Sequence, residues 1–487
     1  MSLVSRSAQL IDTDFGERVV RMAAGGLYHD SLRRPVISAI HAMSPTVMKI
    51  GRRHGASAVI DREKEAFWYA ILDTIDRTAT RRAVTKDFMK TAASTWARSL
   101  ASSETDPARV AFKEEHGIEP PWVLVIAPGA ACNLRCTGCS AAAAGPGPSL
   151  PFEELERIVS EARRLWGIKV LVFTGGEPLL YRSEGKGVLD IAERNPDLLT
   201  LIFTNGSLID RKTARRFERL GTPTPALSVE GLRETTDARR GPGAFDDVLR
   251  AVAALEDAGA LTGISLTATR RNCEEIFSDE FLDFFFREHS AMYGFIFQYM
   301  PEGRDPDPAL MVTPEQRLWM LERSWEVIEE KKIVLADFWN HGTLVGGCVA
   351  AGRDRGYVYI DWDGNVLPCV FAPYSDCNIM EIHSRGGTLN DAWESPFLGA
   401  LREWQTGHAS GDCSCACDKD YRFVYACPVR DHYSDFRDIV LRTGARPIGA
   451  SAGACLSSGQ FTSRMSEYGR DFAELSRPTL DARYRRA

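Results

Sequence analysis

Residues 131–139 read Ala-Cys-Asn-Leu-Arg-Cys-Thr-Gly-Cys and place three cysteines, Cys132, Cys136 and Cys139, in one short loop. This spacing lets a single loop wrap one four-iron cluster, and three thiolates leave the fourth iron without a protein ligand. An iron with an open position can bind a substrate or cofactor directly. The spacing alone leaves zinc as an alternative, because structural zinc sites take four protein ligands and catalytic sites take three.

A second motif begins 35 residues after Cys139 and favours iron–sulfur over zinc. The apolar run Val170–Phe173 ends in Thr-Gly-Gly-Glu-Pro at 174–178, which predicts a buried strand followed by a glycine-rich turn. Glycines in such a turn let the backbone approach a ligand closely. Together the two motifs resemble the radical S-adenosylmethionine (SAM) superfamily, and the pair is more specific than either motif alone.

Length and composition predict a large globular enzyme. The chain has 487 residues, 44% of them hydrophobic, and a formal net charge of −7, which is unlike a disordered chain or a nucleic-acid binder. The sequence has no apolar run of membrane-spanning length and no secretory signal, so we expect a cytoplasmic protein. Twelve cysteines in such a chain are expected to bind metal rather than to form a disulfide framework.

Four stretches of the chain differ in pattern. We expect a helical N-terminal region at 1–115, a barrel domain at 116–335, a cysteine-rich domain at 336–435 and a C-terminal tail, loosely packed, at 436–487. The helical region reads as a cap on the catalytic domain. A substrate-recruiting or membrane-surface module is the alternative, because Val36–Ile50 mixes apolar residues with basic residues just beyond.

Strand-like and helix-like runs alternate through the second stretch. The expected helices include Phe152–Trp166 and Phe245–Ala258. The expected strands are Val123–Ile126, Val170–Phe173, Leu199–Phe203, Ala226–Val229, Ile264–Ala268 and Phe295–Tyr299. Repeated strand–helix units predict an α/β fold with a parallel sheet. They resemble the partial (β/α)6 TIM-like barrel of radical SAM enzymes, whose site lies at the carboxyl ends of the strands.

The resemblance assigns roles to residues at those ends. It implies that Cys132, Cys136 and Cys139 hold a [4Fe–4S] cluster and that Gly175, Gly176 and Glu177 hold the amino group of SAM. It gives further SAM contacts at Thr204, Asn205, Ser228, Glu230 and Arg240, and pocket candidates at Arg270, Asn272, Gln298, Tyr299 and Glu302. Ordinary polar residues closing a barrel rim would look the same.

One position departs from the family pattern. The residue before the last cluster cysteine is commonly aromatic in the family and packs beside the adenine, but here it is Gly138. We therefore expect Ile264 or Tyr299 to supply the adenine contact.

The cysteine-rich stretch resembles the SPASM extension, which carries auxiliary four-iron clusters. Asp363-Gly364 predicts a hairpin turn, and Gly364 to Cys369 matches the extension's G-x4-C element. The expected ligands are Cys348, Cys369, Cys413, Cys415, Cys417 and Cys427. The last four form C-x-C-x-C-x9-C rather than the usual longer pattern, so at least one auxiliary cluster is expected, and zinc is the alternative. Cys273 and Cys455 stand alone as expected thiols.

The resemblance implies a radical SAM enzyme of the SPASM subgroup. Its cofactors would be a [4Fe–4S] cluster, SAM and at least one auxiliary [4Fe–4S] cluster, with a flavodoxin or ferredoxin as reductant. Cleavage of SAM would yield a 5′-deoxyadenosyl radical that abstracts hydrogen from a peptide or small biosynthetic substrate. A non-catalytic iron–sulfur or zinc scaffold, or a lipid-modifying enzyme acting at a membrane surface, is the alternative.

Overall fold

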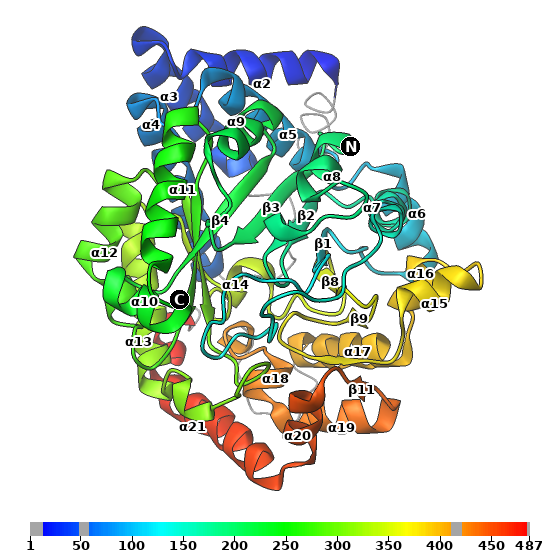
Figure 1. Cartoon of the computed structure of the whole chain (residues 1–487). Helices are drawn as coiled ribbons and strands as arrows, with labels where there is room; N and C mark the ends of the chain where they lie inside the picture. Colours follow the sequence, from blue (N-terminus) through cyan, green and yellow to red (C-terminus); the bar gives the residue numbers. More distant parts are fainter. Residues whose placement is uncertain (1–12, 48–57, 411–420, 485–487) are drawn as a thin grey trace.

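A computed structural model describes residues 13–47, 58–410 and 421–484 (Figure 1). Within these residues, one sheet runs in the order β7-β6-β5-β4-β3-β2-β1-β8-β9. Its strands are β1 (Val123–Ile126), β2 (Val170–Phe173), β3 (Leu199–Thr204), β4 (Pro223–Val229), β5 (Gly263–Ala268), β6 (Tyr293–Gln298), β7 (Leu335–Asp337), β8 (Tyr357–Ile360) and β9 (Val366–Leu367). A small second sheet pairs β10 (Tyr374–Ser375) with β11 (Arg446–Pro447).

The six expected strands are confirmed, and all pair in parallel as β1 to β6. The sheet is nevertheless wider than six strands. β7 extends the β6 edge, and β8 pairs in parallel with β1 at the other edge before turning back into β9. The expected hairpin around Asp363-Gly364 is therefore part of the barrel sheet, and all four residues of β8 are buried.

Helices follow the strands and cover the outside of the curved sheet (Figure 1). The helices of the barrel are α7 (Phe152–Trp166), α8 (Val188–Arg194), α9 (Arg211–Leu220), α10 (Arg233–Arg240), α11 (Ala244–Ala258), α12 (Asp279–Asp283) and α13 (Pro314–Glu329), with short turns η1 (Pro178–Leu180), η2 (Glu275–Phe277), η3 (Phe284–Glu288) and η4 (Pro308–Leu310). α7 has the bounds expected from its period. Its buried stripe includes Leu155, Ile158 and Val159, and left-handed Gly167 ends it.

The N-terminal region is helical, as expected. It consists of α2 (Asp14–Gly26), α3 (Asp30–Val47), α4 (Ala58–Arg81), α5 (Lys86–Ala101) and α6 (Pro107–His116). Its helices pack on the barrel, where Thr85 donates its backbone N–H to the Gly259 carbonyl at 2.8 Å. The basic residues after Val47 that motivated a membrane-surface module lie outside the described residues. No helix in the described ranges has the length and apolar character needed to span a membrane.

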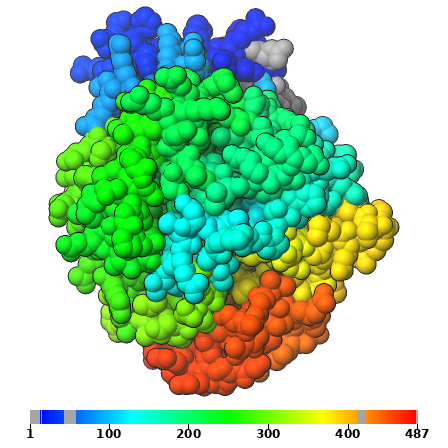
Figure 2. Space-filling view, viewed as in Figure 1, coloured from blue at the N-terminus to red at the C-terminus, as the bar shows by residue number. Residues whose placement is uncertain are grey.

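The C-terminal part is also mainly helical. It holds α14 (Gly342–Val345), α15 (Ile379–Ser384), α16 (Leu389–Trp393), α17 (Pro396–Ser410), η5 (Tyr421–Phe423), α18 (Pro428–Asp431), α19 (Tyr433–Thr443), α20 (Ala450–Ser457) and α21 (Gly459–Tyr484). The blue N-terminal helices lie at one end of the molecule, and the orange-red helices close the opposite end (Figure 2).

The expectation of a loosely packed tail is wrong. α21 buries Met465, Phe472 and Leu480 against the rest of the molecule. At its end, the hydroxyl of Tyr484 donates to the buried Glu63 carboxylate of α4 at 2.8 Å. The composition of the tail, rich in small residues and arginine, concealed this apolar stripe because its members are widely spaced.

Buried His341 makes stability depend on pH. Its Nδ1 accepts from the Asp337 N–H at 3.1 Å, and burial lowers its pKa to about 3. In the unfolded chain His341 binds a proton with a pKa near 6.5, whereas in the folded chain it stays neutral at that pH. The contribution of His341 to the free energy of unfolding is therefore fully present above pH 6.5 and is lost as the pH falls below it. Between pH 7.0 and 5.5 we expect wild type to lose about 1 kcal/mol more unfolding free energy than His341→Gln, measured by urea unfolding. The exposed-site variant His29→Gln should follow wild type; parallel losses in all three proteins would contradict the prediction.

Candidate functional site

The cysteine loop lies at the carboxyl end of β1 and is folded back on itself. Cys132 exchanges two backbone hydrogen bonds with Gly145, at 2.9 and 2.7 Å. The Thr137 N–H donates to the Arg239 carbonyl at 2.9 Å, which ties the loop to α10. Burial, together with the charges of Glu177, Cys136 and Cys139, raises the pKa of Cys132 to about 11. The loop therefore places three cysteine residues at the end of the sheet.

The Gly-Gly-Glu-Pro turn packs directly against the backbone that leads into this loop. The Gly176 N–H donates to the Gly129 carbonyl at 3.1 Å, and the Glu177 N–H donates to the Ala131 carbonyl at 2.8 Å. A Cβ on Gly176 would lie 2.6 Å from the carbonyl oxygen of Ala130. The turn thus extends the β1–β2 pairing beyond the strands, and only glycine permits that approach.

The Glu177 carboxylate joins this turn to the end of β3. One oxygen accepts from the Leu179 N–H at 3.0 Å and the Thr204 hydroxyl at 2.7 Å, and the other accepts from the Asn205 N–H at 2.8 Å. Asn205 in turn donates from its side-chain amide to Asn133 at 2.8 Å, beside Cys132. Three of the expected SAM contacts, Glu177, Thr204 and Asn205, therefore form one network with the cysteine loop.

A second buried carboxylate lies at the end of β4. Glu230 is fully buried and accepts from Arg239 at 2.5 Å and from Arg240 Nε at 2.8 Å. Burial would lower the pKa of Arg240, but Glu230 and then Cys136 outweigh it and raise that pKa. The carboxylate that Arg240 binds within the chain is thus Glu230, and the pair places a guanidinium near the cysteine loop. Ser228 lies two residues earlier, opposite Ser265 of β5.

Tyr299 occupies the space beside Gly138. Gly138 has a φ of +61°, and a Cβ there would lie 2.6 Å from Cε2 of the Tyr299 ring. An aromatic ring from the residue after β6 therefore lies beside position 138. The structure does not bring Ile264 to the site: it is fully buried between the sheet and η3, in the core that includes Phe286 and Leu335.

The segment after β6 clamps the cysteine loop. The Arg304 guanidinium donates to the carbonyls of Cys136 at 2.8 Å, Ala142 at 3.0 Å and Ala143 at 2.6 Å. The backbone N–H of Arg304 donates to the Cys139 carbonyl at 2.9 Å. Sequence reasoning missed Arg304, because its partners are backbone atoms more than 160 residues away and no spacing signals them.

Replacing Arg304 should weaken the binding of iron by the cysteine loop. Arg304→Ala removes three charge-assisted hydrogen bonds from a half-buried side chain, so we expect roughly tenfold faster loss of bound iron to a chelator. The decay of the iron–sulfur absorbance measures that rate. Arg304→Lys should be intermediate, since it keeps the charge without the planar fork. The exposed-site variant Arg271→Ala is the control, and equal rates for it and Arg304→Ala would contradict the clamp.

A second thiol cluster lies in the cysteine-rich stretch. The thiols of Cys348, Cys369 and Cys427 interact electrostatically with one another, and burial raises the pKa of Cys369 well above its usual value. The Tyr357 hydroxyl donates to the Cys369 sulfur at 2.8 Å. Cys377 stands apart, with its sulfur 3.9 Å from the Ala392 carbonyl. The expected ligands Cys413, Cys415 and Cys417 lie outside the described residues.

Both thiol clusters suit an iron–sulfur cluster by their donors. In each, the cysteine thiols interact electrostatically with one another. The network of Glu177, Asn205 and Asn133 fixes the backbone of the first loop. In the described part of the chain, no three His, Cys, Asp or Glu side chains converge on a single metal ion.

Comparison with known proteins finds a matching family model and several similar proteins. The Radical SAM superfamily model matches residues 126–270, from the end of β1 to just beyond β5. The chain is 29% identical over 319 residues to the mycofactocin maturase MftC of Mycolicibacterium smegmatis, covering 63% of this chain and 78% of that protein. It is 28% identical over 282 residues to the AdoMet-dependent heme synthase of Methanosarcina barkeri, covering 52% and 77%.

Among solved structures, Streptococcus suis SuiB bound to S-adenosylmethionine is similar in fold. The TM-score is 0.53 at 20% sequence identity, over 70% of this chain and 80% of SuiB. The complex of SuiB with its precursor peptide SuiA gives a TM-score of 0.50 at 20% identity, over 63% and 72%.

Proposed function

We propose, from the premise that this chain is a radical SAM enzyme with a SPASM-type C-terminal domain, that it modifies a peptide by abstracting hydrogen from an unactivated carbon. The carrying observation is the cysteine loop held against the Gly-Gly-Glu-Pro turn at the carboxyl end of the sheet. Support for a peptide comes from the relatives, because MftC is named a maturase and SuiB was solved with a precursor peptide.

Cys132, Cys136 and Cys139 would hold the SAM-binding cluster. When bound, that cluster supplies an open iron and the electron for reductive cleavage of SAM. The chain's own residues orient the cofactor. The second oxygen of Glu177 accepts one hydrogen bond and so keeps a lone pair for the amino group of SAM. Tyr299 would cover the adenine from the position beside Gly138, and the Arg240–Glu230 pair would fix the rim of the site.

Cys348, Cys369 and Cys427 would hold one auxiliary cluster, with a further ligand from Cys413, Cys415 or Cys417. Tyr357 donates to the Cys369 sulfur, and a hydrogen bond to a cluster ligand is one means of setting its reduction potential. A flavodoxin or ferredoxin would deliver the electrons. Relatives named as maturases and synthases set aside the non-catalytic scaffold; the lipid-modifying enzyme stays a prediction.

Anaerobically reconstituted protein tests this function directly. Protein reduced with dithionite and given SAM should form 5′-deoxyadenosine, quantified by mass spectrometry, whereas oxidised protein should form none. Peptides encoded beside the gene should then raise the yield and change in mass by the loss of hydrogen. Absence of 5′-deoxyadenosine from iron-loaded, SAM-bound protein, with every such peptide unchanged, would refute the proposal.

A tetrapyrrole is the second candidate substrate. The observation that favours it is the similarity to the heme synthase of Methanosarcina barkeri over 282 residues. The same assay separates the two, because a porphyrin substrate would raise 5′-deoxyadenosine yield and lose mass while peptides stay unchanged.

A further inference from the structure

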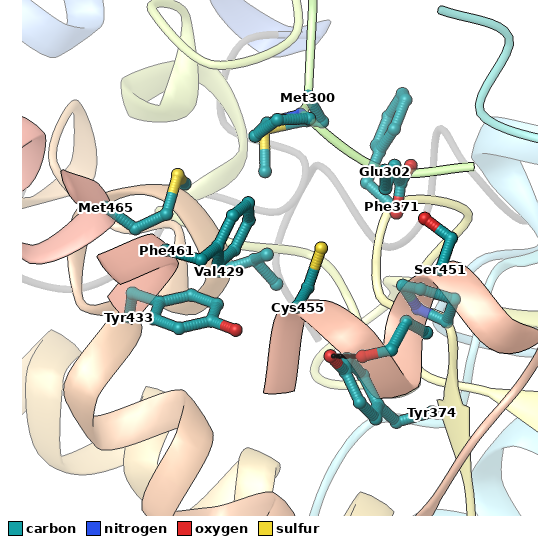
Figure 3. A pocket seen from close by; sticks show the side chains of 13 residues that line it. Met300, Glu302, Phe371, Tyr374, Val429, Tyr433, Ser451, Cys455, Phe461 and Met465 are labelled. Atoms are coloured by element: carbon teal, nitrogen blue, oxygen red, sulfur yellow. Dashed lines mark hydrogen bonds between the residues drawn. The ribbon is translucent and has the colours of Figure 1, made fainter. Parts of the chain in front are cut away.

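A pocket lies between the end of the barrel and the C-terminal helices. It contains about 360 Å³ of space not filled by atoms, part of which is open to solvent. Its walls come from three places: the segment after β6, the segment after Cys369, and helices α18 to α21 (Figure 3).

The pocket holds a carboxylate without a hydrogen-bond partner. Glu302 is 8% exposed, and among the described residues neither of its carboxylate oxygens has a partner. Ser451 likewise has an unpartnered hydroxyl within the described structure. Figure 3 shows the Glu302 carboxylate, the Ser451 hydroxyl and the Cys455 sulfur around the same space. Because a buried polar group without a partner is costly, these atoms point to a ligand that supplies donors.

The charge around Glu302 favours a cation. Among the described residues, the groups that interact with its charge are Cys139 on the barrel side, Cys455 from α20, and the phenols of Tyr299, Tyr359 and Tyr374. None of these carries a positive charge, and burial raises the pKa of Glu302 well above its usual value. The ionised form of Glu302 therefore needs a counter-charge from a ligand.

The aromatic residues that line the pocket also favour a cation. Phe371, Tyr374, Tyr433 and Phe461 contribute rings to the wall, and ring faces attract cations, most strongly where water is excluded. The remaining wall is mainly apolar, with Met300, Val429 and Met465. The lining therefore suits an aliphatic stem that ends in a positively charged nitrogen.

We propose that this pocket is the substrate subsite for an alkylammonium group, with the Glu302 carboxylate as its counter-ion. The assignment rests on the proposed function, which supplies a peptide as the substrate. Either a lysine side chain or the amino terminus of the peptide presents this chemistry. Glu302 lies three residues after Tyr299 and next to the clamp on Cys139, so a group bound there is held beside the SAM-binding end of the barrel.

Three small probes of equal stem length separate the sources of the ammonium group. N-acetyl-lysine methylamide carries only the side-chain ammonium, norleucine methylamide carries only the amino-terminal ammonium, and N-acetyl-norleucine methylamide carries neither. Calorimetric titration of the iron-loaded, SAM-bound protein without reductant measures each affinity. We expect one or both ammonium probes to bind roughly tenfold tighter than the neutral probe.

Glu302→Gln should abolish that preference while iron content and SAM affinity stay at wild-type values, and the exposed-site control Glu280→Gln should behave as wild type. Equal binding of the three probes to wild type, no binding of either ammonium probe, or a Glu302→Gln variant that keeps the preference would each overturn the subsite. Loss of SAM affinity in Glu302→Gln would overturn it too, by assigning the carboxylate to SAM. These titrations need no turnover, so they succeed or fail independently of 5′-deoxyadenosine formation.

Discussion

Gly176→Ala is expected to lower the rate of 5′-deoxyadenosine formation by roughly 100-fold, although it adds a single methyl group. The methyl would overlap the carbonyl oxygens of Ala130 and Ala131, which are backbone atoms that no side-chain rotation can move. The turn must then withdraw from the cysteine loop. That movement breaks the Gly176 to Gly129 and Glu177 to Ala131 hydrogen bonds. A displacement of about 1 Å in a catalytic site costs on the order of 10²-fold in rate.

The backbone conformation of Gly176 makes this a test of packing alone. Gly176 does not have a positive φ, unlike its neighbour Gly175 at +112°, so alanine at 176 meets no penalty from a left-handed φ. Gly459→Ala is the matched control, because a Cβ at Gly459 meets nothing within 4 Å. A Gly176→Ala enzyme with wild-type rate and iron content would show that the turn and the loop do not act as one unit.

The sequence predicted the parallel strands well because their signal is local. Val123–Ile126 and Val170–Phe173 are continuous apolar runs, and the structure gives both strands those bounds. The sequence also predicted the hairpin of β8 and β9 from a local signal, but it did not predict that β8 pairs with β1. Strand order depends on pairing between residues more than 200 positions apart, for example Val123 with Tyr357, and one sequence carries no signal for it.

The residues of the candidate site differ in the same way: those in short local motifs were predictable, and those placed by long-range contacts were not. Cys132 and Glu177 belong to short motifs and were recognisable from spacing. Tyr299 and Ile264 were both expected beside the adenine. The structure places Tyr299 against Gly138 and Ile264 near Gly294, next to Phe286 and Leu335, and the adenine contact itself stays a prediction. Arg304 was not recognisable, because an arginine that binds main-chain carbonyls leaves no partner residue type in the sequence.

Two triple variants should each lose the iron of one cluster and keep the iron of the other. Replacing Cys132, Cys136 and Cys139 by alanine should abolish 5′-deoxyadenosine formation completely and remove the iron of one cluster. The iron held through Cys348, Cys369 and Cys427 should remain, because those thiols interact with one another and have their own hydrogen bond from Tyr357. Iron analysis and low-temperature electron paramagnetic resonance of the reduced protein measure both effects.

The converse variant, with alanine at Cys348, Cys369 and Cys427, should lose the other part of the iron and keep cleavage of SAM in the absence of substrate. The reason is that the cysteine loop is fixed by the Gly-Gly-Glu-Pro turn and by Arg304, neither of which hydrogen-bonds to these three residues. Modification of the peptide should stop if the auxiliary cluster takes part in the reaction, and continue if it only stabilises the fold. Loss of all iron from the first variant would contradict two separate clusters. Loss of SAM cleavage from the second, with its first cluster intact, would instead make the auxiliary cluster the route by which electrons reach the site.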